Sequence, residues 1–171
     1  MAPVNNAALP EKSAGMRWLW LSAVVVLLDQ FSKVLVESTL ELHQSIALIP
    51  SLAIRKIYNS GAAFSFLSDA SGWQRWFFIA LASLVVIVLT VWLYRLQKNQ
   101  LRMALALSLV LGGAVGNLID RVLYGYVIDF IDVYYASWHW PTFNVADSAI
   151  TVGAALLLLD AFASHKKDEA A

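Results

Sequence analysis

Four apolar stretches, each long enough to cross a bilayer, decide what this chain can fold into. A membrane-spanning helix needs about 20 mostly apolar residues, and we expect spans at about 17–37, 75–95, 102–121 and 143–163. Only 14% of the residues are charged, whereas roughly a quarter of an ordinary soluble domain is charged. So few charges would not cover a soluble globule, and 60% of the chain is hydrophobic. The sequence therefore predicts one all-α integral membrane domain, residues 1–171, with four transmembrane helices.

Lysine and arginine are unequally divided between the two ends of the predicted bundle. The end that holds both termini carries Lys12, Arg17, Arg95, Lys98, Arg102, Lys166 and Lys167, and the other end carries Arg55, Lys56, Arg75 and Arg121. Cytoplasmic loops are enriched in these residues, so we expect cytoplasmic termini and periplasmic segments at about 39–72 and 122–142. The first stretch should remain a span and not act as a cleaved signal peptide, because three more spans follow it.

Composition also argues against several classes of function. The net charge is zero, so nucleic acid is not an expected partner. Cysteine is absent, which removes disulfides, thiol nucleophiles and thiolate metal sites. The three histidines are scattered at 43, 139 and 165, and no His-Glu-x-x-His helix occurs. We therefore expect neither a metal nor a cofactor.

The two periplasmic segments carry weaker signals of extended structure. Residues 47–50 and 52–58 read as short strands around a turn, and 59–61 read as a second turn. Residues 62–67 are apolar but too short to span, so we expect them to lie at the membrane interface. Residues 127–131 alternate loosely and could be extended. These segments predict a few short strands on the periplasmic side.

Polar residues of different helices converge at one depth in the membrane. Asp29 lies about 18 Å from the inner surface and Asn117 about 21 Å, at a helical rise of about 1.5 Å per residue. The fourth helix runs the opposite way and begins at the outer side. The outer third therefore gathers Asp29, Asn117, Asp120, Arg121, Asn144 and Asp147, with Asp129 on the connection between the third and fourth helices. The second helix carries no charge in its core and is expected to be scaffold.

Two of these aspartates, Asp129 and Asp147, come from separate segments and are expected to meet at the outer edge of the membrane. A charged carboxylate in hydrocarbon costs roughly 3 kcal/mol or more, and two neighbouring carboxylates in a partly dry site cannot both ionise easily. One then keeps a proton as general acid, and the other can deprotonate water. Asp29 and Lys33, four residues apart on one helix face, could partly neutralise each other.

The motifs resemble those of the bacterial lipoprotein signal peptidase family, signal peptidase II. They are Asp29-Gln30-Phe31-Ser32-Lys33, Asn59-Ser60-Gly61-Ala62-Ala63-Phe64-Ser65, Gly112-Gly113-Ala114-Val115-Gly116-Asn117-Leu118-Ile119-Asp120-Arg121, Val127-Ile128-Asp129-Phe130 and Phe143-Asn144-Val145-Ala146-Asp147. They follow the family order and cover about residues 16–163. The resemblance implies a cofactor-free intramembrane aspartyl endopeptidase of the bacterial inner membrane, with its site near the periplasmic face. It would cut diacylglyceryl-modified prolipoproteins just before the lipidated cysteine. A site formed within one chain requires no partner subunit, so we expect a monomer.

The resemblance also assigns roles to residues. Asp129 and Asp147 match the catalytic pair of the family. Its other functional positions, which bind substrate or support the site, match Asp29, Lys33, Asn59, Gly61, Asn117, Arg121, Asn144 and Ala146. Membrane lipids and globomycin-type cyclic peptide inhibitors are the further ligands it implies, and the fold it implies is a four-helix bundle with an outer β-cradle and a short outer helix.

Simpler interpretations stand beside these. Asp147 could be only a helix N-terminal charge, Asp29 and Lys33 a structural ion pair, and Asp132 a solvated loop residue. For Asp120 we expect a structural role, and Asn59 could only shape its turn. As a whole, the chain could instead be a small proton-coupled transporter, because intramembrane Asp and Lys also mark proton relays. A non-catalytic assembly protein, packed through its glycines, is the third alternative.

Overall fold

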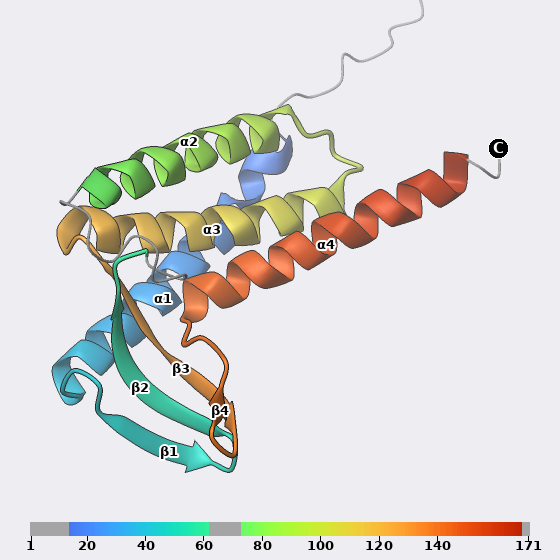
Figure 1. The fold of residues 1–171 in the computed structure, drawn as a ribbon. Helices are drawn as coiled ribbons and strands as arrows, with labels where there is room; N and C mark the ends of the chain where they lie inside the picture. Colours follow the sequence, from blue (N-terminus) through green and yellow to red (C-terminus); the bar gives the residue numbers. More distant parts are fainter. Residues whose placement is uncertain (1–13, 62–72, 169–171) are drawn as a thin grey trace, which may run out of the picture.

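The computed structural model describes residues 14–61 and 73–168, with side chains to residue 163. A short 3-10 helix, Ala14–Trp18, leads into α1, Leu19–Thr39, and the other helices are α2, Trp73–Arg95, α3, Leu101–Leu123, and α4, Val145–Asp168. The strands are β1, Ser45–Ile49, β2, Leu52–Asn59, β3, Val127–Tyr135, and β4, Trp138–His139. The predicted class, four long apolar helices with a small sheet, is confirmed (Figure 1). The interfacial helix expected at 62–67 lies outside the described residues.

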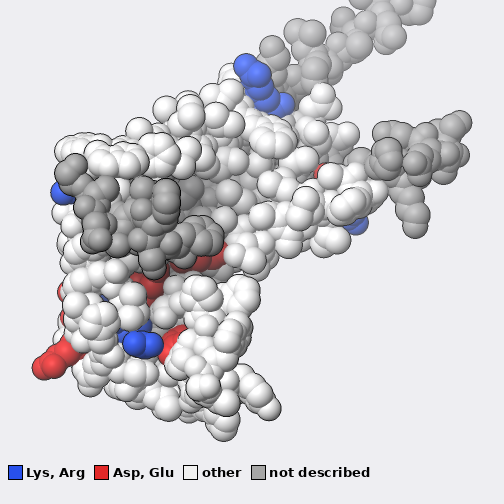
Figure 2. Space-filling view, in the orientation of Figure 1, with Lys and Arg blue, Asp and Glu red and all other residues white. Residues whose placement is uncertain are grey.

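All four helices have the length and composition of membrane spans, over Ala14–Thr39, Trp73–Arg95, Leu101–Leu123 and Val145–Ala163. Large apolar side chains cover their outer surfaces, including Leu27, Phe31, Trp76 and Phe162, which are each 68% to 70% exposed. A soluble monomer rarely exposes so much contiguous apolar surface. On the face shown in Figure 2, acidic atoms gather where the helices meet the sheet, and the rest of the helical surface is almost uncharged.

The third helix is the centre of the bundle and packs against α1, α2 and α4 (Figure 1). Leu93, Leu107 and Leu111 form part of an apolar core between α2 and α3. Small residues let α3 approach its other neighbours closely. A Cβ atom at Gly113 would collide with the backbone carbonyl of Ala146 in α4, and one at Gly116 would lie 2.6 Å from Oδ2 of Asp29 in α1. Gly116 thus leaves room for a buried carboxylate between the helices.

Only a narrow stripe of α1 faces the bundle. It consists of Ser22, Val25, Asp29, Lys33 and Val36, whose spacing of three or four residues places them on one helix face. Three of the five are polar, whereas most of the remaining α1 surface is apolar and faces outward. This is the reverse of a soluble amphipathic helix, and it puts the charges of α1 inside the protein.

The sheet lies at the end of the bundle opposite the first and last described residues (Figure 1). Its order is β1-β2-β3-β4, antiparallel throughout, and it contains the strands expected at 47–50, 52–58 and 127–131. Val36, Leu40 and Phe130 form the apolar contact between α1 and the sheet. From the sequence, Lys56 was noted only as one of the basic residues on the outer side. The structure buries it, with Nζ 3.2 Å from Oε2 of Glu37 and 2.9 Å from the carbonyl of Leu40 at the end of α1.

Candidate active site

Asp129 lies in β3, and Asp147 lies in the first turn of α4. Asn144, fully buried and directly before α4, connects them. Its Nδ2 donates to Oδ1 of Asp129 at 2.7 Å, and its backbone N–H donates to Oδ2 of Asp147 at 3.3 Å. The sequence left Asn144 without a defined contact; the structure makes it the one described residue that bonds both carboxylates.

Asn144 and Asp147 also form the N-terminal cap of α4. Oδ1 of Asn144 accepts from the backbone N–H of Asp147 at 2.9 Å, and Oδ2 of Asp147 accepts from the backbone N–H of Asn144 at 3.3 Å. This reciprocal arrangement is a capping box. The simpler interpretation of Asp147 as a helix N-terminal charge is therefore geometrically right, but it accounts for only one oxygen. The other, Oδ1, accepts from Nδ2 of Asn117 at 2.7 Å.

Asp129 is almost completely buried, with 2% of its surface exposed. Asn59, the last residue of β2, donates from Nδ2 to Oδ2 of Asp129 at 2.9 Å. Burial, the largest cause, and the negative charge of Asp147 together raise the pKa of Asp129 to about 7, against the lowering effects of the Asn59 and Asn144 bonds and of the Lys33 charge. A carboxyl group with this pKa can hold or release a proton at neutral pH.

Gly61 fixes the orientation of Asn59. Its backbone N–H donates to Oδ1 of Asn59 at 2.9 Å, which leaves the Nδ2 of the same amide to face Asp129. The φ angle of Gly61 is +95°, in the region that only glycine adopts without strain. A turn at 59–61 was expected, and Asn59 does shape it, but its amide also contacts a carboxylate.

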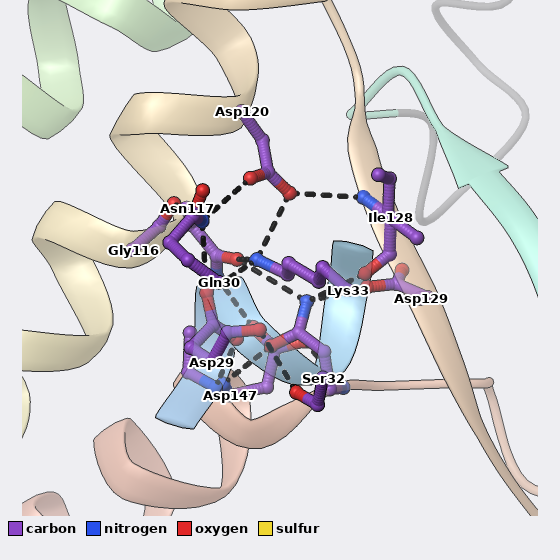
Figure 3. Close-up of polar contacts among 12 residues, drawn as sticks. Asp29, Gln30, Ser32, Lys33, Gly116, Asn117, Asp120, Ile128, Asp129 and Asp147 are labelled. Atoms are coloured by element: carbon purple, nitrogen blue, oxygen red, sulfur yellow. Dashed lines mark hydrogen bonds and ion pairs between the residues drawn. The ribbon is translucent and has the colours of Figure 1, made fainter. Parts of the chain in front are cut away.

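Lys33 forms a second polar centre beside the carboxylate pair (Figure 3). Its Nζ lies 2.7 Å from Asp29 Oδ2, 2.9 Å from Asp120 Oδ2 and 3.0 Å from Asn117 Oδ1. Lys33, Asp29 and Asp120 are each at most 1% exposed. The other oxygen of Asp29 accepts from the backbone N–H of Ala146 at 2.9 Å. The expected Asp29–Lys33 ion pair therefore also joins α1 to α3 and to the start of α4.

Arg121 and Arg75 lie at the edge of the site. Nη1 of Arg121 donates to the carbonyl of Asn117 at 3.2 Å, and its guanidinium lies 5.5 Å from the ring centroid of Phe78. Arg75, in the first turn of α2, donates to the carbonyls of Arg121 and Val122 at 3.2 and 2.7 Å. In this way α2, which has no charge in its core, braces the outer end of α3.

Sequence analysis missed two polar residues, one of them in this cluster, and misplaced a third. Gln30 was not singled out; its Nε2 donates to Asp120 Oδ1 at 2.8 Å and to the Gly116 carbonyl at 3.2 Å. An amide beside Asp29 inside an apolar span was the available signal. Lys56 was the second. Asp132 was expected to be solvated, and this was wrong: it is 1% exposed and lies 2.8 Å from Nδ1 of His139. The strand continues to Tyr135, past the residue where the expected strand ended.

Within the part of the chain that the structure describes, no group of three His, Cys, Asp or Glu residues could hold a metal ion. The fold and the cluster define a multi-pass membrane protein with a buried, carboxylate-rich site at one end of its helix bundle. Such a site, built from three helices and a sheet, is specific enough to compare with known proteins.

The comparisons give one family. The family model described as Signal peptidase (SPase) II matches residues 21–163. The lipoprotein signal peptidase of Pseudomonas fluorescens is 56% identical over 155 residues, covering 90% of this chain and 91% of that protein. The one from Alteromonas mediterranea is 49% identical over 156 residues, covering 91% and 86%. This chain belongs to the signal peptidase II family, a family of membrane-embedded peptidases.

A solved structure agrees with this membership. A bacterial membrane enzyme determined by the in meso method at 2.3 Å resolution is 32% identical, with a TM-score of 0.80, covering 93% of this chain and 95% of the other. The fold of the chain is therefore that of a known membrane enzyme over nearly its whole length.

Proposed function

We propose that the protein is an aspartyl endopeptidase with Asp129 and Asp147 as its catalytic pair. The observation that carries the proposal is the arrangement around Asn144, in which two carboxylates from different elements bond one buried amide residue. No described cation is ion-paired with either carboxylate. Their charges therefore oppose each other, which favours a state in which the pair shares one proton.

Hydrolysis needs only these two groups and a water molecule. The raised pKa of Asp129 makes it the proposed proton holder, and Asp147 is the proposed base. Asp147 removes a proton from water, the water oxygen bonds to the peptide carbonyl carbon, and Asp129 gives its proton to the carbonyl oxygen. The C–N bond then breaks as Asp147 passes its proton to the leaving nitrogen and Asp129 regains its own. The net change is the addition of one water across the peptide bond.

The proposed substrate is a prolipoprotein whose cysteine carries a diacylglyceryl group, with cleavage just before that cysteine. The names of the relatives, lipoprotein signal peptidases, support this substrate class. A site at the outer end of four spans would let the diacylglyceryl chains stay in the bilayer while the peptide reaches the carboxylates. Globomycin-type cyclic peptides are the proposed inhibitors. The residues proposed to bind substrate or support the site are Asp29, Lys33, Asn59, Gly61, Asn117, Arg121, Asn144 and Ala146.

The proposed location is the bacterial inner membrane, with both termini in the cytoplasm and the site near the periplasmic face. The excess of Lys and Arg at the end that holds the termini supports this orientation. The Asp129–Asp147 pair and its hydrogen bonds need no residue from a second subunit, and the proposed active form is a monomer.

Proton-coupled transport gains no observation of its own. Of the described buried polar residues, only Ser22 and Ser108 lie in the inner half of the bundle. Ser22 donates to the carbonyl of Ser108 at 2.7 Å, a contact that packs α1 on α3. Two serines do not form a relay of ionisable groups across a membrane.

A cleavage assay with purified protein in detergent tests the proposal. The substrates are one prolipoprotein with and without its diacylglyceryl group, each incubated with a chelator present. We expect chelator-resistant cleavage of the lipidated form only, and none by Asp147→Asn or Asp129→Asn. Cleavage at the normal rate by either folded variant would remove that aspartate from the mechanism. A well-folded wild-type protein that cuts neither substrate would refute the peptidase.

A further inference from the structure

A buried acid that the proposed mechanism does not use lies three residues beyond Asp129 in the same strand. The two carboxylate oxygens of Asp132 lie 2.8 and 3.1 Å from Nδ1 of His139 in β4. Asp132 is 1% exposed, whereas the His139 side chain is 44% exposed. The His139 ring also stacks on Tyr134, with centroids 5.4 Å apart. A buried carboxylate is costly without a partner, and His139 supplies that partner.

The chain that follows His139 carries the residue on which the site depends. After β4 it returns along β3 and reaches Asn144. Four backbone hydrogen bonds hold this returning segment on β3. Trp140 N–H donates to the Val133 carbonyl at 2.8 Å, Ile131 and Phe143 exchange a pair at 2.7 and 3.1 Å, and Phe130 N–H donates to the Phe143 carbonyl at 3.0 Å. The alignment of the return on β3 therefore determines where Asn144 meets Asp129.

That alignment contains one extra residue. In the hairpin, Tyr135 lies opposite Trp138 and Tyr134 opposite His139. The same register, continued, would place Thr142 opposite Ile131, but Phe143 lies there instead. The return chain thus has a one-residue bulge between Trp140 and Phe143. Pro141 lies within it, at a kind of position where the missing N–H of proline is tolerated.

Losing the bulge would disrupt the site. A slip of one residue would shift Asn144 by about 3.3 Å along β3 and turn its side chain to the other face. A two-residue strand such as β4 is marginal by itself. The Asp132–His139 bond connects the two sides of the hairpin diagonally, next to the bulge, where it opposes such a slip.

We infer that Asp132 and His139 are positioning residues: their bond fixes the register of residues 138–143 on β3, and so holds Asn144 against Asp129 and Asp147. The inference rests on the proposed function for its catalytic consequence. Its structural part, the register of the return chain, stands independently. Neither residue contacts the reacting groups, so each acts only through Asn144.

Three variants of neighbouring residues test this. His139→Phe keeps a ring to stack on Tyr134 but removes the donor. His139→Asn keeps a donor near the position of Nδ1. Trp138→Phe changes the other residue of β4, whose ring contacts Trp140, and serves as the matched control. We expect kcat of His139→Phe to fall roughly a hundredfold with KM little changed, because a displacement of about 1 Å in a site costs about that much. His139→Asn should recover most of it, and Trp138→Phe should resemble wild type.

Hydrogen exchange gives a readout that does not depend on catalysis. The Phe143 N–H, bonded to Ile131, should exchange faster in His139→Phe than in wild type or in Trp138→Phe, with helix amides unchanged. If His139→Phe does not fold, Asp132→Leu, which removes the buried carboxylate at similar volume, takes its place with the same expected results. Wild-type kcat together with wild-type Phe143 exchange would overturn the inference, and so would His139→Asn behaving like His139→Phe. An inactive wild-type protein would refute the peptidase, and the exchange comparison would still decide the register.

Discussion

Two pairs of aspartates lie side by side in one polar cluster, but only one pair forms ion pairs with a lysine. Asp29 and Asp120 share the ammonium group of Lys33, at 2.7 and 2.9 Å. From the described residues, Asp129 and Asp147 receive hydrogen bonds from amide groups only, among them Asn144 Nδ2 to Asp129 at 2.7 Å. The first pair is bound to a cation inside the protein, whereas no described cation lies within ion-pair distance of the second.

The difference separates stability from chemistry. An ammonium group placed between two carboxylates offsets the cost of burying them, and breaking such a group is strongly destabilising. Amides hold a carboxylate in place but leave its charge, so a shared proton remains available to the reaction. Asn117 joins the two pairs, because its Oδ1 accepts from Lys33 and its Nδ2 donates to Asp147. The Lys33 centre thus aligns the amide that holds Asp147.

The largest expected effect is on catalysis by the amide-held pair. Asp147→Asn should lower kcat/KM by roughly a thousandfold or more, because it removes the general base. Its thermal unfolding temperature in detergent should change little, since the amide can still accept from Asn117. The same substitution in the lysine-held pair, Asp120→Asn, is the matched control and should lower stability more than it lowers the activity of the folded protein. The comparison fails if both variants lose the same property.

Removing the cation should have the next largest effect. Lys33→Met leaves Asp29 and Asp120 buried without a counter-charge, and we expect it to lower the free energy of unfolding by about 3 to 5 kcal/mol. Denaturant unfolding in detergent measures this, with Arg102→Met, an exposed cation at the other end of the bundle, as control. Adding Asp29→Asn and Asp120→Asn to Lys33→Met should restore part of the stability. An unchanged Lys33→Met protein would mean that the two carboxylates are not held as a charged centre.

The pH dependence of catalysis tests whether Asp129, in the amide-held pair, carries the proton that is donated. Its pKa is raised to about 7 by burial, so kcat/KM should fall as pH rises above about 7 and Asp129 loses the proton it donates. The bond from Asn59 lowers that pKa. Asn59→Ala should therefore move the high-pH fall in kcat/KM, the basic limb of the pH profile, to higher pH, although the maximal rate should be lower. A limb that stays in place, or moves to lower pH, would contradict the assignment of the proton to Asp129.

The free energy of unfolding should also depend on pH, and it should decrease as Asp129 loses its proton. The ordinary pKa of an aspartate is 3.8, and that of Asp129 in the folded protein is about 7. Between these two pH values, the folded protein holds a proton on Asp129 that the unfolded chain has lost. This contribution to the free energy of unfolding is therefore present at low pH and is lost as pH rises through about 7. Asp129→Asn has no such group, so its unfolding temperature should depend less on pH across this window. Equal slopes for the two proteins would count against the raised pKa.

The parts of the site that lie on helices could be predicted from sequence, because helical rise fixes depth. Asp29 and Asn117 were expected at one level, and the structure brings them together through Lys33. The parts on strands could not be predicted as well. Asp132 was misplaced because neither the length of β3 nor the bulge opposite it leaves a periodic signal. Strand register depends on contacts between distant segments.

The smallest effect should come from Gln30, an amide in the lysine-held centre. It donates to Asp120 at 2.8 Å and to the Gly116 carbonyl at 3.2 Å, but no described contact joins it to Asp129 or Asp147. Gln30→Leu should lower the free energy of unfolding by about 1 kcal/mol, the typical net value of a lost hydrogen bond, and leave kcat and the basic limb unchanged. Asn117→Leu is the contrast, because Asn117 bonds both centres and should lose stability and activity together. A fall in kcat for Gln30→Leu that equals the fall for Asn117→Leu would show that the two centres act as one unit, and the separation of stability from chemistry would then be wrong.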